Sequence, residues 1–130
     1  MMPGATTGSV RSLLRLEGFV VLAASVAAYA RFGSGWGLFA ACFLLPDLSF
    51  LGYLANARAG AAAYNAAHSS VGGIGLVAIG AVFGAPAFVA AGLIWLAHVG
   101  FDRALGYGLK YGRGFGYTHL GPVGAAAREA

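Results

Sequence analysis

Four long apolar stretches constrain this chain more than any other feature of its sequence. They cover about residues 13–32, 36–54, 60–83 and 86–105. A helix rises about 1.5 Å per residue, so about 20 apolar residues cross a hydrocarbon core about 30 Å thick. Of the 130 residues, 59% are hydrophobic and only 9% are charged, which excludes an ordinary soluble domain. The sequence therefore predicts a membrane protein with four spans.

Short turn-forming segments separate these stretches. Glycine, serine, asparagine and proline gather at residues 33–35, 56–58 and 84–86, and such clusters end helices. Links this short make consecutive helices neighbours that run antiparallel. We therefore predict an all-α fold, an antiparallel four-helix transmembrane bundle that forms one domain over residues 1–130 and ends in a short tail at 106–130.

Lysine and arginine predict the orientation of this bundle, because basic residues in short loops mark the cytoplasmic side. With four spans, the N-terminus, the second link and the C-terminal tail share one side. That side carries Arg11, Arg15, Arg58, Arg103, Lys110, Arg113 and Arg128. Only Arg31 lies opposite. Both termini should be cytoplasmic, and the net charge of +4 favours anionic lipid headgroups as partners rather than nucleic acid.

The first stretch also admits a second interpretation, as a cleaved signal peptide. Arg11 and Arg15 would form its basic end, and residues 28–30 read AYA, which resembles a cleavage site. Glu17 interrupts the start of the apolar run, however. Cleavage would also leave only three spans, so a membrane helix is the better interpretation.

Acidic and histidine side chains recur at similar depths in all four predicted helices. From the predicted cytoplasmic ends, the depths are about 6 Å for Glu17, about 10 Å for Asp47, about 12 Å for His68, about 10 Å for His98 and about 5 Å for Asp102. A charged side chain in hydrocarbon costs about 2.5–3.5 kcal/mol on insertion scales. We therefore expect these side chains to face one another inside the bundle.

One interpretation of this convergence is a metal centre. Carboxylate and imidazole ligands suit divalent metals such as zinc, iron or manganese, and His98 and Asp102 share a helix face because they lie four residues apart. The candidate ligands are Asp47, His68, His98 and Asp102. A bound metal could activate water for hydrolysis of a lipid ester or phosphoester.

Further residues complete this enzyme hypothesis. Glu17 or His119 would transfer the proton. Three basic residues near the cytoplasmic ends of the helices would hold an anionic headgroup at the entrance. They are Arg58, Arg103 and Lys110.

Two other interpretations stay open at this point. The same residues could pass protons or bind a polar solute in a transporter, which would need a homo-oligomer because one chain of this size makes a small pore. Alternatively, the cluster is structural: Asp102 would pair with Arg58 or Lys110, and the histidines would hydrogen-bond to side chains such as Asn65. The sequence does not choose among the three.

Five motifs in order along the chain carry a family resemblance. They are RLEG at 15–18, PDLSFLGY at 46–53, YNAAH at 64–68, HVGFDRALGYGLKY at 98–111 and THLG at 118–121. Together they resemble domain of unknown function family 4260, a group of small bacterial integral membrane proteins. The resemblance implies a multi-span protein of the bacterial plasma (inner) membrane and leaves its activity open. A fainter similarity links Pro46-Asp47, Arg58 and His68 to membrane-bound metal-dependent hydrolases, and this analogy slightly favours a hydrolase.

Overall fold

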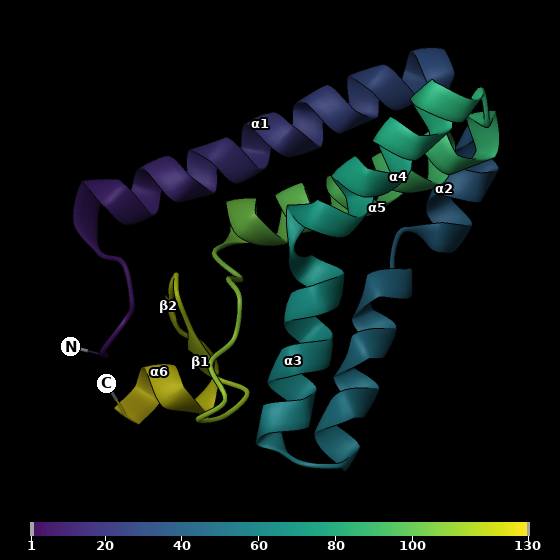
Figure 1. The fold of residues 1–130 in the computed structure, drawn as a ribbon. Helices are drawn as coiled ribbons and strands as arrows, with labels where there is room; N and C mark the ends of the chain where they lie inside the picture. Colours follow the sequence, from purple (N-terminus) through teal and green to yellow (C-terminus); the bar gives the residue numbers. More distant parts are fainter. Residues whose placement is uncertain (1, 130) are drawn as a thin grey trace.

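The computed structural model describes residues 2–129, and the ribbon in Figure 1 is mostly helical. In chain order its elements are α1 (Gly8–Phe32), α2 (Trp36–Cys42), the 3-10 helix η1 (Leu45–Leu54), α3 (Ala57–His68), α4 (Ser70–Phe83), α5 (Pro86–Leu105), β1 (Tyr117–Thr118), β2 (Gly121–Pro122) and α6 (Ala125–Glu129). Four helical stretches within these residues are long and apolar enough to cross a membrane: Gly8–Phe32, Trp36–Leu54, Ala57–Phe83 and Pro86–Leu105. The predicted all-α membrane fold is confirmed.

Two of the four stretches, the second and the third, are broken by changes in backbone geometry. The second changes from α2 to a 3-10 helix around Leu44, and Pro46 lies in the first turn of η1. The third is interrupted at Ser69, whose backbone is extended (φ −80°, ψ 149°). The Ser69 hydroxyl accepts a hydrogen bond from the N–H of Val71 (3.2 Å) and so caps the start of α4.

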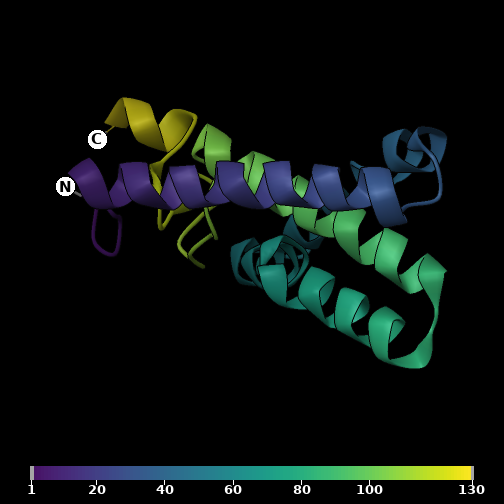
Figure 2. The ribbon, with the colours of Figure 1, turned by 90° about the horizontal axis from the view of Figure 1, so that it is seen from above.

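These breaks change how the helices are arranged. α5 packs against both α1 and α4, while α3 and η1 pack against each other as an antiparallel hairpin. Figures 1 and 2 show this hairpin projecting steeply from the α1, α4 and α5 group. The bundle is therefore made of bent spans rather than four straight ones, and the bend in the third span lies near its centre.

Glycines let α5 approach its two neighbours closely. A Cβ atom placed on Gly100 would lie 2.6 Å from the carbonyl oxygen of Gly18 in α1. A Cβ on Gly92 would lie 2.7 Å from the carbonyl oxygen of Gly73 in α4. Backbone contact through small residues is what joins helices in lipid, where apolar burial drives little association.

The segment after α5, residues 106–129, is folded against the rest of the molecule, and we call it the C-terminal cap. Its two short strands pair antiparallel, with Thr118 opposite Gly121. The start of the chain is bonded to it, since the N–H and hydroxyl of Thr6 both donate to the carbonyl of His119 (2.8 and 3.0 Å). The cap therefore fixes the start of α1 beside the end of α5.

Candidate metal centre

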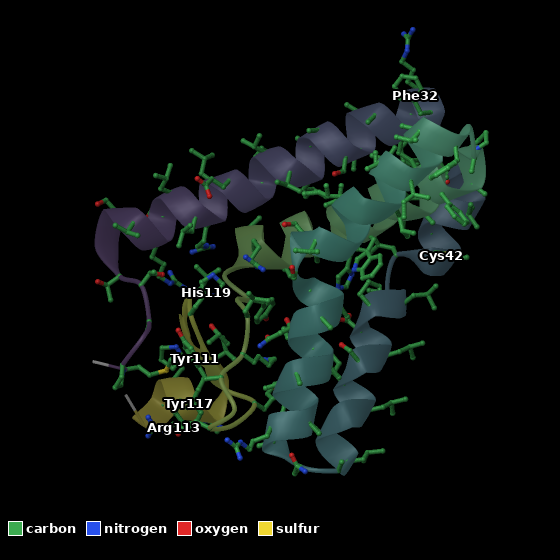
Figure 3. The ribbon with its side chains drawn as sticks, in the orientation of Figure 1. Phe32, Cys42, Tyr111, Arg113, Tyr117 and His119 are labelled. Carbon is green, nitrogen blue, oxygen red and sulfur yellow. The ribbon has the colours of Figure 1, made fainter. Side chains whose placement is uncertain are left out.

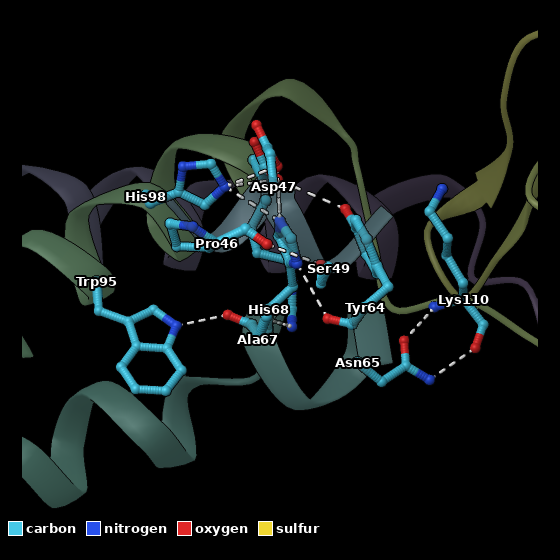
Figure 4. A network of polar contacts seen from close by, with 12 residues as sticks. Pro46, Asp47, Ser49, Tyr64, Asn65, Ala67, His68, Trp95, His98 and Lys110 are labelled. Carbon is cyan, nitrogen blue, oxygen red and sulfur yellow. Dashed lines mark hydrogen bonds and ion pairs between the residues drawn. The ribbon is translucent and has the colours of Figure 1, made fainter. Parts of the chain in front are cut away.

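Four side chains from three elements converge where α3 bends into α4. Asp47 comes from η1, His68 from the last turn of α3, and His98 and Asp102 from adjacent turns of α5. One ligand atom from each lies within 4.8 Å of those of the other three. Figure 4 shows Asp47, His68 and His98 turned toward one another and joined by dashed lines. The four candidate metal ligands predicted from the sequence are thus brought together.

The separations of these ligand atoms suit a single metal ion. Nε2 of His68 lies 3.1 Å from Nε2 of His98, 3.0 Å from Oδ1 of Asp47 and 3.3 Å from Oδ2 of Asp102. Nε2 of His98 lies 3.2 Å from Oδ1 of Asp47 and 3.5 Å from Oδ2 of Asp102. Ligands about 2.0–2.1 Å from a tetrahedral zinc ion are about 3.3–3.4 Å apart. These five separations are therefore close to those of a tetrahedral shell, and the ligand atoms of Asp47 and Asp102 lie within 4.8 Å of each other.

The hydrogen bond on the other side of the His68 ring determines which nitrogen can bind a metal. Nδ1 of His68 lies 3.0 Å from the carbonyl oxygen of Tyr64, one turn earlier in α3. Because a carbonyl oxygen only accepts, Nδ1 carries a hydrogen, and in the neutral ring Nε2 then points its lone pair at the cluster. A backbone carbonyl behind the ring is the usual second partner of a metal-bound histidine.

Burial makes a positive charge at this point necessary. His68 and His98 are only 2% and 1% exposed, and two carboxylates face them. With Nε2 of His68 unprotonated, the centre holds mutually repelling acceptors unless a proton or a metal ion lies between them. Two carboxylates and two neutral imidazoles around a divalent ion have no net charge, which is the form least costly to bury in a membrane.

Aromatic rings hold both imidazoles in place. Tyr64 stacks on His68 with the ring centres 3.7 Å apart and the planes 8° from parallel. Phe43 meets His98 edge to face at 5.3 Å. The hydroxyl of Tyr64 also donates a long hydrogen bond to Oδ2 of Asp102 (3.5 Å). The ligand atoms are thus positioned by packing on α3 and α5 before any metal binds.

Two side chains of α5 stabilise the bend that aims His68 at the cluster. The indole N–H of Trp95 donates to the carbonyl of Ala67, and Nη2 of Arg103 donates to the carbonyl of His68 (2.9 Å). Carbonyls at the end of a helix have no partner within it, and in a membrane they need one from elsewhere. The sequence alone does not reveal this role of Trp95. The available signal was the Ser69-Ser70 pair after His68, since serine favours helix starts.

The chain matches one known protein family, and the matched region includes the residues of this site. Residues 11–123 match the family described as Domain of unknown function (DUF4260). The chain belongs to this family. The resemblance seen in the sequence is therefore confirmed, and all four cluster residues lie within the matched region. No curated protein and no solved structure matches the chain.

The structure does not bring the two predicted proton-transfer residues of this DUF4260 chain into the cluster. Glu17 is exposed on α1, because its neighbour Gly18 is the residue that contacts α5 and successive helix residues point about 100° apart. His119 lies in the C-terminal cap (Figure 3), where its Nδ1 accepts from the N–H of Leu109 (2.8 Å). Burial, together with the positive charge of Arg103, lowers the pKa of His119. A neutral His119 suits this structural role.

The three residues predicted to bind a headgroup differ in what they contact. Arg58 is exposed near the start of α3. Arg103 is bonded to the carbonyl of His68, as described above. Lys110 is only 5% exposed. Its Nζ donates to the backbone carbonyl of Phe115 (2.8 Å) and lies 3.7 Å from the centre of the Phe115 aromatic ring. Burial lowers the pKa of Lys110 to about 8. Arg103 and Lys110 thus have internal partners, and Arg58 is the exposed one.

The pairs expected for a purely structural cluster differ from the pairs that the structure forms. Over residues 2–129, Oδ2 of Asp102 lies 3.3 and 3.5 Å from the Nε2 atoms of His68 and His98, and Asp102 pairs with neither of the basic residues expected beside it. Asn65 bonds to the backbone of Lys110 in both directions, donating to its carbonyl (2.8 Å) and accepting from its N–H (2.7 Å). The histidines therefore have carboxylate partners, not the amide partner expected.

Proposed function

We propose that this protein is a membrane-embedded, metal-dependent hydrolase that acts on an ester or phosphoester of a lipid-like substrate. The observation that carries the proposal is the convergence of four ligand atoms with separations of 3.0–3.5 Å on two buried histidines. Zinc is the first candidate because it takes nitrogen and oxygen ligands in a shell of this size. Iron or manganese takes the same ligand types with more coordination positions.

Hydrolysis requires a position on the metal for water or substrate. Four protein ligands fill a tetrahedral shell, so the ion must gain a fifth position or one ligand must move. Asp47 is the candidate to move, because its side chain is 34% exposed whereas that of Asp102 is 14% exposed. Water and substrate would therefore approach from the Asp47 side.

The reaction needs no co-reactant other than water. The oxygen of a water molecule forms a bond to the carbonyl carbon or phosphorus, the bond to the leaving alkoxide breaks, and the proton of the water passes to that alkoxide. A bound divalent metal would lower the pKa of the water and polarise the ester oxygen. Asp47 lies where it can hold the proton between these steps, in the role first assigned to Glu17 or His119.

Proton transfer is the second candidate function, and one distance favours it. The two Nε2 atoms of His68 and His98 are 3.1 Å apart, within reach of a shared proton. A transporter that uses this pair needs no metal, and a homo-oligomer would supply its pore. Metal content separates the two functions, because the proton path predicts an active protein that holds no metal.

Charge supports a location for the site. The basic residues near the start of α1 and in the C-terminal cap share one end of the molecule, while Arg31 lies at the far end of α1. By the positive-inside rule, we propose that both termini face the cytoplasm of a bacterium and that the protein lies in the plasma membrane beside anionic headgroups.

Chelation and metal replacement test the enzyme directly. The purified protein is stripped with a chelator, reloaded with zinc, manganese or iron(II), and assayed on a long-chain fluorogenic ester and a long-chain phosphodiester. We expect hydrolysis to return with one of the metals, to be absent in His98→Ala and to persist in Glu17→Gln, which removes a carboxylate outside the cluster. Hydrolysis that survives both chelation and His98→Ala would contradict the proposal.

A further inference from the structure

A cavity of about 400 Å³ lies between the broken second and third spans and α5. Its lining includes Cys42 and Pro46 from the second span, Ala67 from the end of α3, and Ile94 and Trp95 from α5. This volume is within the range of small-molecule sites, about 300–1,000 Å³. The lining residues of the second and third spans lie on both sides of the breaks in these spans.

The cavity adjoins the metal ligands along the chain on all three sides. Pro46 directly precedes Asp47, and Ala67 directly precedes His68. Ile94 lies one helical turn before His98 on α5, and residues four apart share a helix face. Figure 4 shows Pro46, Ala67 and Trp95 around His68. The cavity therefore borders the segments that carry the cluster residues, although the four ligand side chains are not among those that line it.

The chemistry of the lining selects a hydrocarbon. Apart from Ser49 and the indole nitrogen of Trp95, the side chains that line the cavity are apolar. The hydroxyl of Ser49 donates to the carbonyl of Pro46 (2.7 Å), and the Trp95 N–H donates to the carbonyl of Ala67. Both donors are already paired within the protein, so a polar ligand would lose its hydrogen bonds with water and gain few here.

We propose that this cavity holds one hydrocarbon chain of the lipid substrate and so places the ester or phosphoester group at the cluster. The inference rests on the proposed function, because the chain serves to position the group that is hydrolysed. It adds a specificity: substrates need a long chain, and water-soluble short-chain esters bind poorly. A cavity within membrane-length helices can receive such a chain directly from the bilayer.

The single cysteine of the chain provides a probe inside the cavity. Cys42 is the only cysteine, and it lines the cavity near the end of α2 (Figure 3). In metal-stripped protein, we expect an octyl methanethiosulfonate to modify Cys42 at least about tenfold faster than a trimethylammonium-ethyl one, because a cation is costly in hydrocarbon. A long-chain alcohol should protect Cys42 at saturating concentration, and a short-chain alcohol should not.

A matched pair of variants separates the cavity from the surrounding lipid. Ala91 lines the cavity and Ala87 does not, although they lie one turn apart on α5 and both are exposed. Ala91→Phe should abolish protection by the long-chain alcohol, and Ala87→Phe should leave it unchanged. The inference would be overturned if the two reagents modified Cys42 at equal rates, or if the long-chain alcohol did not protect Cys42 in the parent protein. Both of these measurements use the parent protein and do not require either variant to fold.

The same measurements separate this inference from the proposed function. Chain protection of Cys42 is measured without metal and without hydrolysis. Protection in a protein that binds no metal would support the chain site and overturn the hydrolase. Metal binding without protection would overturn the chain site and leave the metal centre standing.

Discussion

Nε2 of His68 lies 3.1 Å from Nε2 of His98, although the two residues are 30 positions apart in the sequence. Each ring is held on its other side by the protein, His68 by stacking on Tyr64 and His98 by the edge of Phe43. Two buried imidazole nitrogens that face each other beside two carboxylates need a proton or a metal ion between them. This relationship is the basis of the metal-centre proposal.

Removing the Tyr64 ring should matter more than removing its hydroxyl. The hydroxyl bond to Asp102 is long at 3.5 Å, so we expect Tyr64→Phe to weaken metal binding by less than about tenfold. Tyr64→Ala removes a ring that is 2% exposed and should cost about 3–5 kcal/mol of unfolding free energy. Metal titration and unfolding in detergent check the two changes; equal effects of both variants would contradict this account.

The Trp95 hydrogen bond should contribute to stability through the bend in the third span. Trp95→Phe keeps an aromatic ring against Gly72 and leaves the carbonyl of Ala67 without its donor. We expect a loss of about 0.6–2 kcal/mol, the range for polar contacts between membrane helices. Trp36→Phe is the control, because Trp36 is 51% exposed. If both variants unfold at the same temperature as the parent, the bend does not depend on this bond.

Lys110 should make stability rise with pH in the alkaline range. Burial lowers its pKa from 10.5 to about 8 in the folded protein, so between these values the unfolded chain binds more protons than the folded one. Stability therefore increases from about pH 8 to about pH 10.5. Lys110→Met should remove this increase, and the difference in melting temperature between parent and variant over that range measures it. A constant difference across the range would show that Lys110 does not titrate as expected.

Gly100 should not tolerate a side chain. A Cβ there would lie 2.6 Å from the carbonyl oxygen of Gly18, so Gly100→Ala forces α1 away from α5 and should cost about 1–3 kcal/mol. Gly75 is the control, because a Cβ at that position meets no atom within 4 Å. Gly75→Ala should be neutral or slightly stabilising, since alanine favours a helix more than glycine does. Equal effects of the two substitutions on stability would contradict the close packing of Gly100 against α1.

Depth along the predicted helices was enough to identify the four cluster residues. Asp47, His68, His98 and Asp102 lie at similar heights, and buried charge has to be paired in a membrane. The same counting wrongly placed Glu17 with them, because height along a helix does not determine direction around it. The structure shows that its neighbour Gly18 is the residue that faces α5, so the side chain of Glu17 points away.

The break in the third span could not be deduced from hydropathy. Apart from Asn65 and His68, the residues within four positions of Ser69 are apolar or small, so a continuous helix and a bent one share the same composition. The bend depends on partners distant in sequence, Trp95 and Arg103, which no local pattern identifies. The position of His119 was missed for a similar reason, since its bonds to Leu109 and Thr6 fix it within the C-terminal cap.

Metal content of the purified protein tests the central claim most directly. Protein prepared in mild detergent without chelator is measured by elemental mass spectrometry beside His68→Ala, His98→Ala and the control Glu17→Gln, with folding checked by circular dichroism. The account predicts about one divalent metal per chain in the parent and the control, and none in the folded histidine variants. A folded parent that holds no metal and takes up none from added zinc, manganese or iron(II) would contradict it.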